Sequence, residues 1–202
     1  CGRPAFSALR ITGGGESLPG RWPWMAATFM NIGGIEEYIC GGSLIGPRHI
    51  LTAAHCTIMN RNISKFNSGS SIHEEVERSH YVMPLCLPPP SARFETFAHM
   101  KATVAGWGQT SHDGGISAVL REVQIPVWLN DDCNPYYSVL INSSFVCAGQ
   151  KEGRGSSYIG DSGGPLMLEY DGRWIQIGIV SFGRIFNYPY VPGVIAIANS
   201  IL

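Results

Sequence analysis

Short segments rich in β-branched and aromatic residues recur along the chain, and stretches rich in Gly, Pro, Asn and Ser separate them. Segments of this length and composition, bounded by turn-forming residues, are typical of β-strands. They predict strands at Trp24–Met30, Tyr38–Leu44, His49–Thr52, Ala102–Gly106, Val119–Val127, Pro165–Glu169, Trp174–Phe182 and Gly193–Ala198. Many short strands with glycine-marked bends predict an all-β fold, either a sandwich or a barrel.

The polar stretches between these segments predict turns, one helical turn and a loop. Turns are expected at Gly33-Gly34, at Asp113-Gly114-Gly115 and at Asp171-Gly172, because these pairs favour tight reversals. Asn130–Tyr137 predicts a short helical turn. Cys56–Ser79 is polar with little periodicity, and we expect it to be a loop.

Composition narrows the function classes. Of the 202 residues, 45% are hydrophobic and 14% are charged, which favours a packed globular protein over a disordered one. The net charge of −1 provides no basic field for nucleic acid or an anionic membrane. No apolar run approaches the ~20 residues that span a bilayer. Since the sequence starts at Cys1, we expect that a secretion signal or pro-region has been removed or left out.

The six cysteines indicate an oxidising compartment. None forms a C-x-x-C pair, which argues against a zinc site or thioredoxin chemistry, and nothing calls for a cofactor. An even number at wide spacing fits the disulfide framework of a secreted protein. Two glycosylation sequons, at Asn62-Ile63-Ser64 and Asn142-Ser143-Ser144, support an extracellular location.

Two motifs carry the candidate chemistry. Gly160–Pro165 reads Gly-Asp-Ser-Gly-Gly-Pro and presents Ser162 on a glycine-rich turn, and Thr52–Cys56 reads Thr-Ala-Ala-His-Cys and presents His55. A serine hydroxyl is a weak nucleophile until a neighbouring base takes its proton, so these two residues would need each other. The structural alternatives are a Gly-Ser turn and a packed histidine.

From Ile11 onward the chain resembles a chymotrypsin/trypsin-like serine protease. The resemblance lies in blocks that follow the family's order: Arg10–Gly14, Cys40–Ile45, Leu51–Cys56, Pro84–Pro88, Ala105–Gly108, Gly160–Pro165, Val180–Gly183 and Pro192–Val194. Two further segments, Trp22–Met25 and Val119–Val123, look most similar to arthropod clotting-cascade proteases of the proclotting-enzyme type.

The resemblance implies two perpendicular, six-stranded antiparallel β-barrels with the active site between them. Residues 1–10 would end a pro-segment and residues 11–202 would form the peptidase domain. The first barrel would cover about 24–100 and be incomplete, and the second about 101–202, with the family's C-terminal helix cut short. The implied disulfides are Cys40–Cys56, Cys133–Cys147 and Cys1–Cys86, the last tying the pro-segment to the catalytic domain.

The resemblance also assigns roles. Ser162 would be the nucleophile and His55 the general base, and the backbone N–H groups of Gly160 and Ser162 would form the oxyanion hole. Cleavage after Arg10 would free the amine of Ile11. That amine would pair with Asp161 and order the site, so the chain as written is a zymogen.

Specificity residues depart from the trypsin pattern. Ser156 stands where trypsin-like members have the aspartate that attracts Lys or Arg, so a neutral pocket floor would favour apolar or aromatic side chains. Gly183 and Gly193 would keep the pocket walls open. Tyr158 and Phe186 replace a family disulfide and could fill part of the pocket.

The triad aspartate is missing. In the family it lies between the histidine and the Pro84–Pro88 block, but this interval holds only Glu74, Glu75 and Glu77 as acids. The interval is also short, which suggests an internal deletion near residues 79–82. Glu75 or Glu77 could substitute, although a solvated charged run explains them more simply.

Three hypotheses therefore stay open. The chain is a secreted endopeptidase zymogen with protein substrates, an activating protease that cleaves after Arg10, and protein inhibitors; or a non-catalytic homologue that binds partners; or a truncated product without a stable fold.

Overall fold

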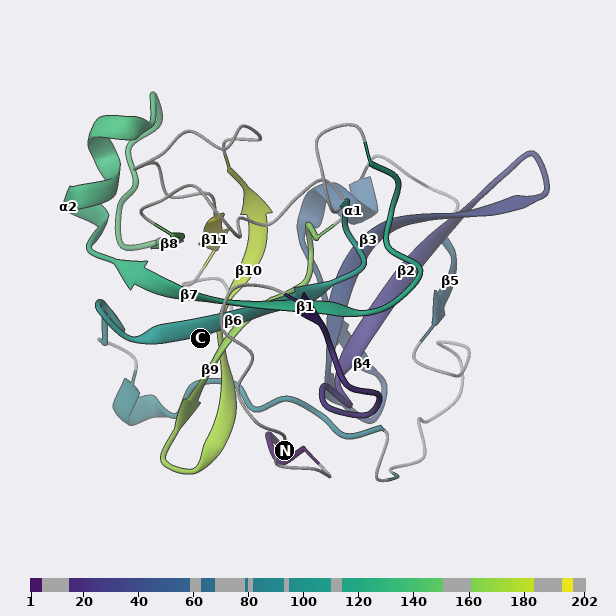
Figure 1. Ribbon diagram of the computed structural model, residues 1–202, viewed down its shortest axis with the longest axis horizontal. Coiled ribbons are helices and arrows are strands. Elements are labelled where there is room, and N and C mark those ends of the chain that lie inside the picture. The colour runs from purple at the N-terminus through teal and green to yellow at the C-terminus, as the bar shows by residue number, and fades with distance from the viewer. Residues whose placement is uncertain are drawn as a thin grey trace.

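The computed structural model describes residues 1–4, 15–58, 63–67, 79, 82–92, 95–109, 114–150, 161–183 and 194–197. These residues form strands in two sheets with few helical turns, which confirms the chymotrypsin-type all-β prediction. In Figure 1 one sheet lies on the left, the other on the right, and the short helix α1 near the top between them. No helix among the described residues is long and apolar enough to cross a membrane.

The larger sheet closes into a barrel. Its order is β7-β6-β9-β10-β11-β8, and an additional β7–β8 pairing joins the two ends into a ring of six antiparallel strands. A seventh strand, β1 (Gly15–Glu16), pairs with the first two residues of β7, Arg121 and Glu122. The barrel strands are β6 (Lys101–Gly106), β7 (Arg121–Trp128), β8 (Phe145–Ala148), β9 (Pro165–Tyr170), β10 (Arg173–Phe182) and β11 (Val194–Ile197).

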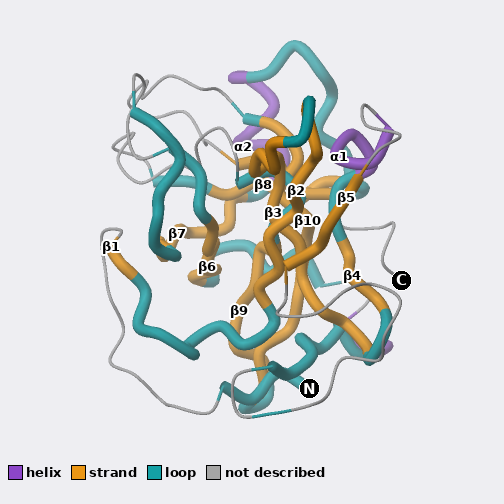
Figure 2. Tube along the Cα trace, turned by 90° about the vertical axis from the view of Figure 1, so that its right-hand side faces the viewer, coloured by secondary structure: helices purple, strands orange, loops and turns teal. Residues whose placement is uncertain are grey.

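The smaller sheet has four described strands in the order β4-β3-β2-β5 and faces the viewer in Figure 2. Its strands are β2 (Met25–Ile32), β3 (Ile35–Gly46), β4 (His49–Leu51) and β5 (Ile63–Asn67). The predicted turn between β2 and β3 is present, since Gly33 and Gly34 both have positive φ and Asn31 Oδ1 accepts the Gly34 N–H at 2.8 Å.

One sequence prediction was wrong. Cys56–Ser79 is not a simple loop, because its described part contains the end of α1 (Ala54–Ile58) and strand β5. β5 has no strong apolar run of its own, and it forms where β2 supplies the hydrogen-bonding partner, from Ala27↔Asn67 to Met30↔Ile63. The two short strands β1 and β8 were missed for the same reason, since their partners are remote in sequence.

The predicted helical turn at Asn130–Tyr137 is confirmed. Helix α2 (Asn130–Cys133) continues into the 3₁₀ turn η2 (Asn134–Tyr136). A further 3₁₀ turn, η1 (Pro90–Ala92), lies in the connection between the two sheets.

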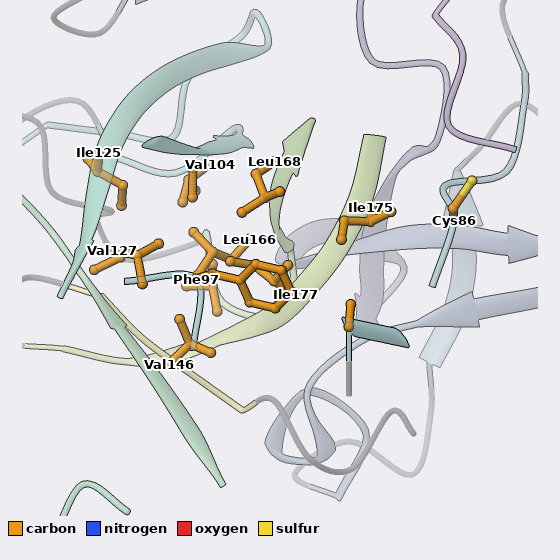
Figure 3. Packing of buried hydrophobic residues seen from close by; sticks show 14 residues of the cluster. Cys86, Phe97, Val104, Ile125, Val127, Val146, Leu166, Leu168, Ile175 and Ile177 are labelled. Atoms are coloured by element: carbon orange, nitrogen blue, oxygen red, sulfur yellow. The ribbon is translucent and has the colours of Figure 1, made fainter. Parts of the chain in front are cut away.

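Apolar side chains fill the closed barrel. Figure 3 shows Phe97, Leu166 and Ile177 meeting at its centre, and Leu166 is fully buried. Full burial of one such side chain stabilises the fold by about 1.5–3 kcal/mol. A second cluster lies where the sheets meet, with Trp24 and Met167 both at 0% exposure. Because this second cluster contains residues of both sheets, such as Leu44 of β3 and Met167 of β9, it joins the sheets through apolar packing.

Three disulfides fasten the chain, with the pairing that the family resemblance implied. They join Cys1 to Cys86, Cys40 to Cys56 and Cys133 to Cys147. The first holds the N-terminal residues against the barrel, where the Trp174 N–H of β10 donates to the Gly2 carbonyl at 2.8 Å. The second fastens α1 to β3 and so fixes the segment that carries His55.

Candidate active site

His55 lies in α1, directly after the short strand β4 and the linking residues Thr52 and Ala53. The Cys56 N–H donates to the Ala53 carbonyl at 3.0 Å, and the Cys56 side chain is buried and bonded to Cys40. His55 itself is exposed. Because its neighbour is anchored, the imidazole is attached to a fixed backbone and is open to solvent.

Ser162 lies on the turn that leads into β9. Three backbone hydrogen bonds hold the turn: Gly164 N–H to the Asp161 carbonyl at 3.1 Å, Gly163 N–H to the Val180 carbonyl at 2.7 Å, and Gly41 N–H to the Ser162 carbonyl at 2.8 Å. Val180 belongs to β10 and Gly41 to β3. The nucleophile turn is thus bound to both sheets at once.

Gly163 brings the serine and histidine segments into contact. Its φ is +83°, in the left-handed region that glycine tolerates. A Cβ at this position would overlap Thr52 Oγ1 and would lie 3.1 Å from Cys56 Sγ. The residue after Ser162 therefore packs against the residue after His55, and only glycine fits there.

Asp161 points away from this contact, toward the loop that follows β6. Its Oδ1 accepts the Gly108 N–H at 2.9 Å. A Cβ on Gly108 would lie 2.5 Å from the same oxygen, and one on Gly106 would also collide with it. The backbone of this loop thus comes close enough to hold the carboxylate, which a side chain at either glycine would prevent.

The Asp161 carboxylate also acts on Tyr38 of β3. Burial raises the pKa of the Tyr38 hydroxyl well above its usual range, and the negative charge of Asp161 raises it further. A hydrogen bond with the Trp107 backbone opposes both effects. Tyr38 also packs edge-on against the Trp107 ring, with centroids 6.3 Å apart. The phenol is therefore a neutral, largely covered neighbour of the Asp161 site.

In the part of the chain that the structure describes, no carboxylate pairs with His55. A ring nitrogen of His55 lies within 4.8 Å of the sulfurs of Cys40 and Cys56. Those sulfurs are bonded to each other, so they are not thiolates that could bind a metal.

Several predicted site residues lie outside the described part of the chain. Gly183 is described and directly follows β10, the strand whose Val180 binds the nucleophile turn. Asn142 is described and exposed, in the loop before β8. Those outside are Arg10, Ile11, Asn62, Glu74, Glu75, Glu77, Ser156, Tyr158, Gly160, Phe186 and Gly193.

Sequence reasoning assigned no role to three residues that shape the site. Thr52 Oγ1 donates to the Gly41 carbonyl at 2.8 Å, and this bond closes the pocket that receives Gly163. Thr52 and Gly41 stand in the family blocks, but no pattern in the sequence indicates that they touch. Tyr38 gave no signal, because its relation to Asp161 exists only across the sheet boundary.

Sequence comparison with known proteins indicates the family. The family model described as Trypsin matches residues 11–74 and 67–201. The chain is 33% identical over 234 positions to a venom protease of Bombus pensylvanicus, covering 95% of this chain and 96% of that protein. It is 32% identical over 242 positions to proclotting enzyme of Tachypleus tridentatus, covering 96% of this chain.

A third relative is the clotting factor G beta subunit of Tachypleus tridentatus, at 32% identity over 243 positions, with 96% of this chain and 77% of that protein covered. The chain spans 64% of proclotting enzyme, which is less than two thirds of that protein's length. Given the family match over nearly the whole chain and the venom protease covered almost end to end at 33% identity, this chain belongs to the trypsin family of serine proteases.

Proposed function

We propose that this chain is a secreted serine endopeptidase zymogen that acts in a proteolytic clotting or immune cascade. The observation that carries the proposal is the packing of Gly163 against Thr52 and Cys56, which brings the segments of Ser162 and His55 together. The names of the clotting relatives support the cascade. Three disulfides support an extracellular location, since such bonds persist in oxidising compartments.

The chemistry follows from the two side chains. His55 takes the hydroxyl proton of Ser162 as Oγ attacks the scissile carbonyl carbon, and the carbonyl oxygen gains the negative charge. The N–H groups of Gly160 and Ser162 would stabilise that oxyanion; one such donor contributes about 10²–10³ to the rate. His55 then protonates the leaving amine, which leaves an acyl-enzyme. Water, deprotonated by His55, releases the acid and restores Ser162.

Activation would require cleavage after Arg10 by an upstream protease. The new amine of Ile11 would then form an ion pair with Asp161. Support comes from the position of Asp161, directly before Ser162, with its carboxylate half-buried beside Gly108. An ion pair in such a setting is expensive to break on one side, about 3–5 kcal/mol, so it would hold the nucleophile turn in place.

Substrate preference would follow from Ser156, Gly183 and Gly193. With no carboxylate at Ser156, the pocket floor is neutral, and we expect peptides with Phe, Tyr or Leu before the scissile bond to be cleaved faster than those with Arg or Lys. Protein substrates and protein inhibitors would be the partners. A panel of chromogenic peptides that differ only at this residue tests the preference.

A fluorophosphonate probe tests the function directly. The secreted chain is cleaved after Arg10, the new N-terminus at Ile11 is verified by sequencing, and the probe is added to this chain and to a Ser162→Ala control. Labelling of the cleaved chain well above the control supports the proposal. Labelling equal to the control, in a chain that still unfolds cooperatively on heating, contradicts it.

A second candidate is a catalytically impaired homologue that binds partners. It is favoured by the absence of a carboxylate partner for His55 among the described residues. Two further observations support an internal deletion, and the first points to the stretch around residues 67–74. The family match is split into segments that overlap at 67–74, and the alignment with proclotting enzyme runs over 242 positions although the chain has 202 residues.

Loss of the triad aspartate would lower the catalytic rate strongly. In a Ser-His-Asp protease where this was measured, replacing the triad Asp with Asn lowers the turnover rate about 10⁴-fold. This corresponds to a rise of roughly 5.5 kcal/mol in the activation barrier. A transcript with an in-frame exon at residues 79–82, encoding an aspartate, would identify the present chain as a shortened isoform. Slow labelling of Ser162 together with cooperative unfolding would favour the impaired homologue over a chain without a stable fold.

A further inference from the structure

We propose that Asn142 carries an N-linked glycan whose inner sugars cover the exposed apolar pair Val139–Leu140. The sequence shows only a sequon. The structure adds a rigid loop, a side-chain nitrogen without a hydrogen-bonding role, and an apolar surface two residues away.

The loop that presents Asn142 is firmly held. It joins η2 to β8 at the outer end of the barrel, beside α2 (Figure 1). Asn130 Nδ2 donates to the Asn142 carbonyl at 2.7 Å, and Asn134 Oδ1 accepts the Ile141 N–H at 2.7 Å. The Cys133–Cys147 disulfide closes the base of the loop. The backbone of this loop is therefore fixed, and it keeps the exposed side chains of the loop at the surface.

Of the two polar atoms of the Asn142 side chain, one forms a hydrogen bond within the fold and the other is left to solvent. Oδ1 accepts the Ser144 N–H at 2.9 Å, which forms a local turn within the sequon. Nδ2 makes no hydrogen bond to any described residue, and Asn142 is exposed. Modification at Nδ2 would therefore break no contact of the fold.

The reaction is a transfer from a lipid-linked oligosaccharide diphosphate. A bond forms between Nδ2 and C1 of the first sugar, and the bond from C1 to the diphosphate oxygen breaks. Nδ2 loses one proton, and the lipid diphosphate leaves with the bonding electrons. No oxidant or reductant takes part. The product is a bulky, solvated group on a surface loop.

Val139 and Leu140 form the exposed apolar surface that the glycan on Asn142 would cover. They are 54% and 70% exposed, while the next residue, Ile141, is buried at 1% and anchors the loop to the Cys133–Cys147 cluster. Leu140 is the most exposed large hydrophobic side chain in the described part of the chain. Since two residues span at most about 7 Å, the first sugars on Asn142 stand beside Leu140.

The site is tested in two matched variants. The chain is secreted from eukaryotic cells, and glycopeptides are identified by mass spectrometry. Ser144→Ala removes the sequon but keeps Asn142 and its Oδ1 contact to the backbone N–H, whereas Ser64→Ala removes only the other sequon. We expect the Asn142 glycopeptide in the parent and in Ser64→Ala, and its complete loss in Ser144→Ala. An unmodified Asn142 peptide in the secreted parent overturns the proposal.

The covering role has its own measurement. Binding of the dye ANS, which reports exposed apolar surface, is compared between the parent, Ser144→Ala, and the folded parent trimmed by an endoglycosidase to one sugar. We expect ANS fluorescence to rise about twofold in Ser144→Ala, and Leu140→Ser in that background to reverse the rise. An unchanged signal after loss of the glycan overturns the covering role, as does a rise that Leu140→Ser does not reverse. Neither readout involves peptidase activity, so this proposal and the proposed function fail independently.

Discussion

Gly163 touches Thr52 across the boundary between the two sheets, and a single methyl group at Gly163 would overlap the threonine hydroxyl oxygen. Gly163 follows the candidate nucleophile, and Thr52 lies two residues before the first residue of the histidine helix. The contact thus couples the position of Ser162 to the position of His55. Because the contact is so close, substitutions at or near it should have measurable effects.

Gly163→Ala should disrupt the site more than its backbone angle alone explains. The Cβ would also lie 2.5 Å from the Gly41 carbonyl oxygen, so the nucleophile turn must move. Gly172→Ala is the matched control, since Gly172 has φ +70° and open space around it. A non-Gly residue at such an angle costs about 1–2 kcal/mol, which both variants share.

We therefore expect Gly172→Ala to lose about that amount in urea unfolding and to keep Ser162 labelling. Gly163→Ala should lose more stability and most of its labelling. Equal effects of the two variants would show that crowding at Thr52 does not control the nucleophile turn.

The Ser43–Gln176 hydrogen bond should be a strong link between the sheets. Ser43 Oγ donates to Gln176 Oε1 at 2.6 Å, and both residues are 0% exposed. Ser43→Ala leaves a buried amide oxygen without this donor, which costs about 1–3 kcal/mol. In the double variant Ser43→Ala/Gln176→Leu the unfolding free energy should fall by less than the sum of the single losses. Additive losses in a urea-denaturation cycle would contradict this coupling.

Tyr38 should make the fold sensitive to alkali. Its folded pKa is raised above the ordinary value of 10.0 by burial and by Asp161, so the unfolded chain loses the phenolic proton first. The contribution to stability is complete below about pH 10 and is lost as the pH rises toward the folded pKa, at about 1.4 kcal/mol per pH unit. Thermal unfolding between pH 8 and 11 should show this decline in the parent, and Tyr38→Phe should flatten it. Tyr136→Phe is the control, and an identical decline in all three proteins would refute the assignment.

The Cys40–Cys56 disulfide should matter for the site beyond its effect on stability. Cys133–Cys147 closes a loop of similar size, with a separation of 14 residues against 16. Replacing either pair with alanine should cost about 3 kcal/mol by the chain-entropy argument. Only the Cys40→Ala/Cys56→Ala variant frees α1 from β3, so only it should lose Ser162 labelling under conditions where the protein remains folded. Comparable labelling in both variants would rule out this role.

Much of the architecture could be predicted because it is local. Positions such as Gly33-Gly34 and Asp171-Gly172 need positive φ, and the sequence shows glycine where the turns occur. Strands β9 and β10 carry their own apolar residues and join by a short turn, so their pattern suffices. β5 could not be found this way, because Ile63–Asn67 becomes a strand by pairing with β2, more than thirty residues earlier.

The candidate site likewise combines residues that can be recognised from the sequence with residues that only the fold brings together. Ser162, His55 and Asp161 stand in motifs whose chemistry can be recognised from residue types alone. Tyr38 cannot, because a tyrosine in a strand is ordinary until its position beside the Asp161 carboxylate is known. The roles of Thr52 and Gly41 depend likewise on a hydrogen bond between segments that only folding brings together.

The sequence by itself determined the all-β class, the turns and the two chemical motifs, because each depends on residue identity over a few consecutive positions. Only the tertiary structure decided that β7 and β8 close a barrel, that Gly163 fits beneath Thr52, and that Gly108 holds the Asp161 carboxylate. These are contacts between residues far apart in the chain. Their energies depend on packing and on solvent exclusion, which no short segment contains on its own.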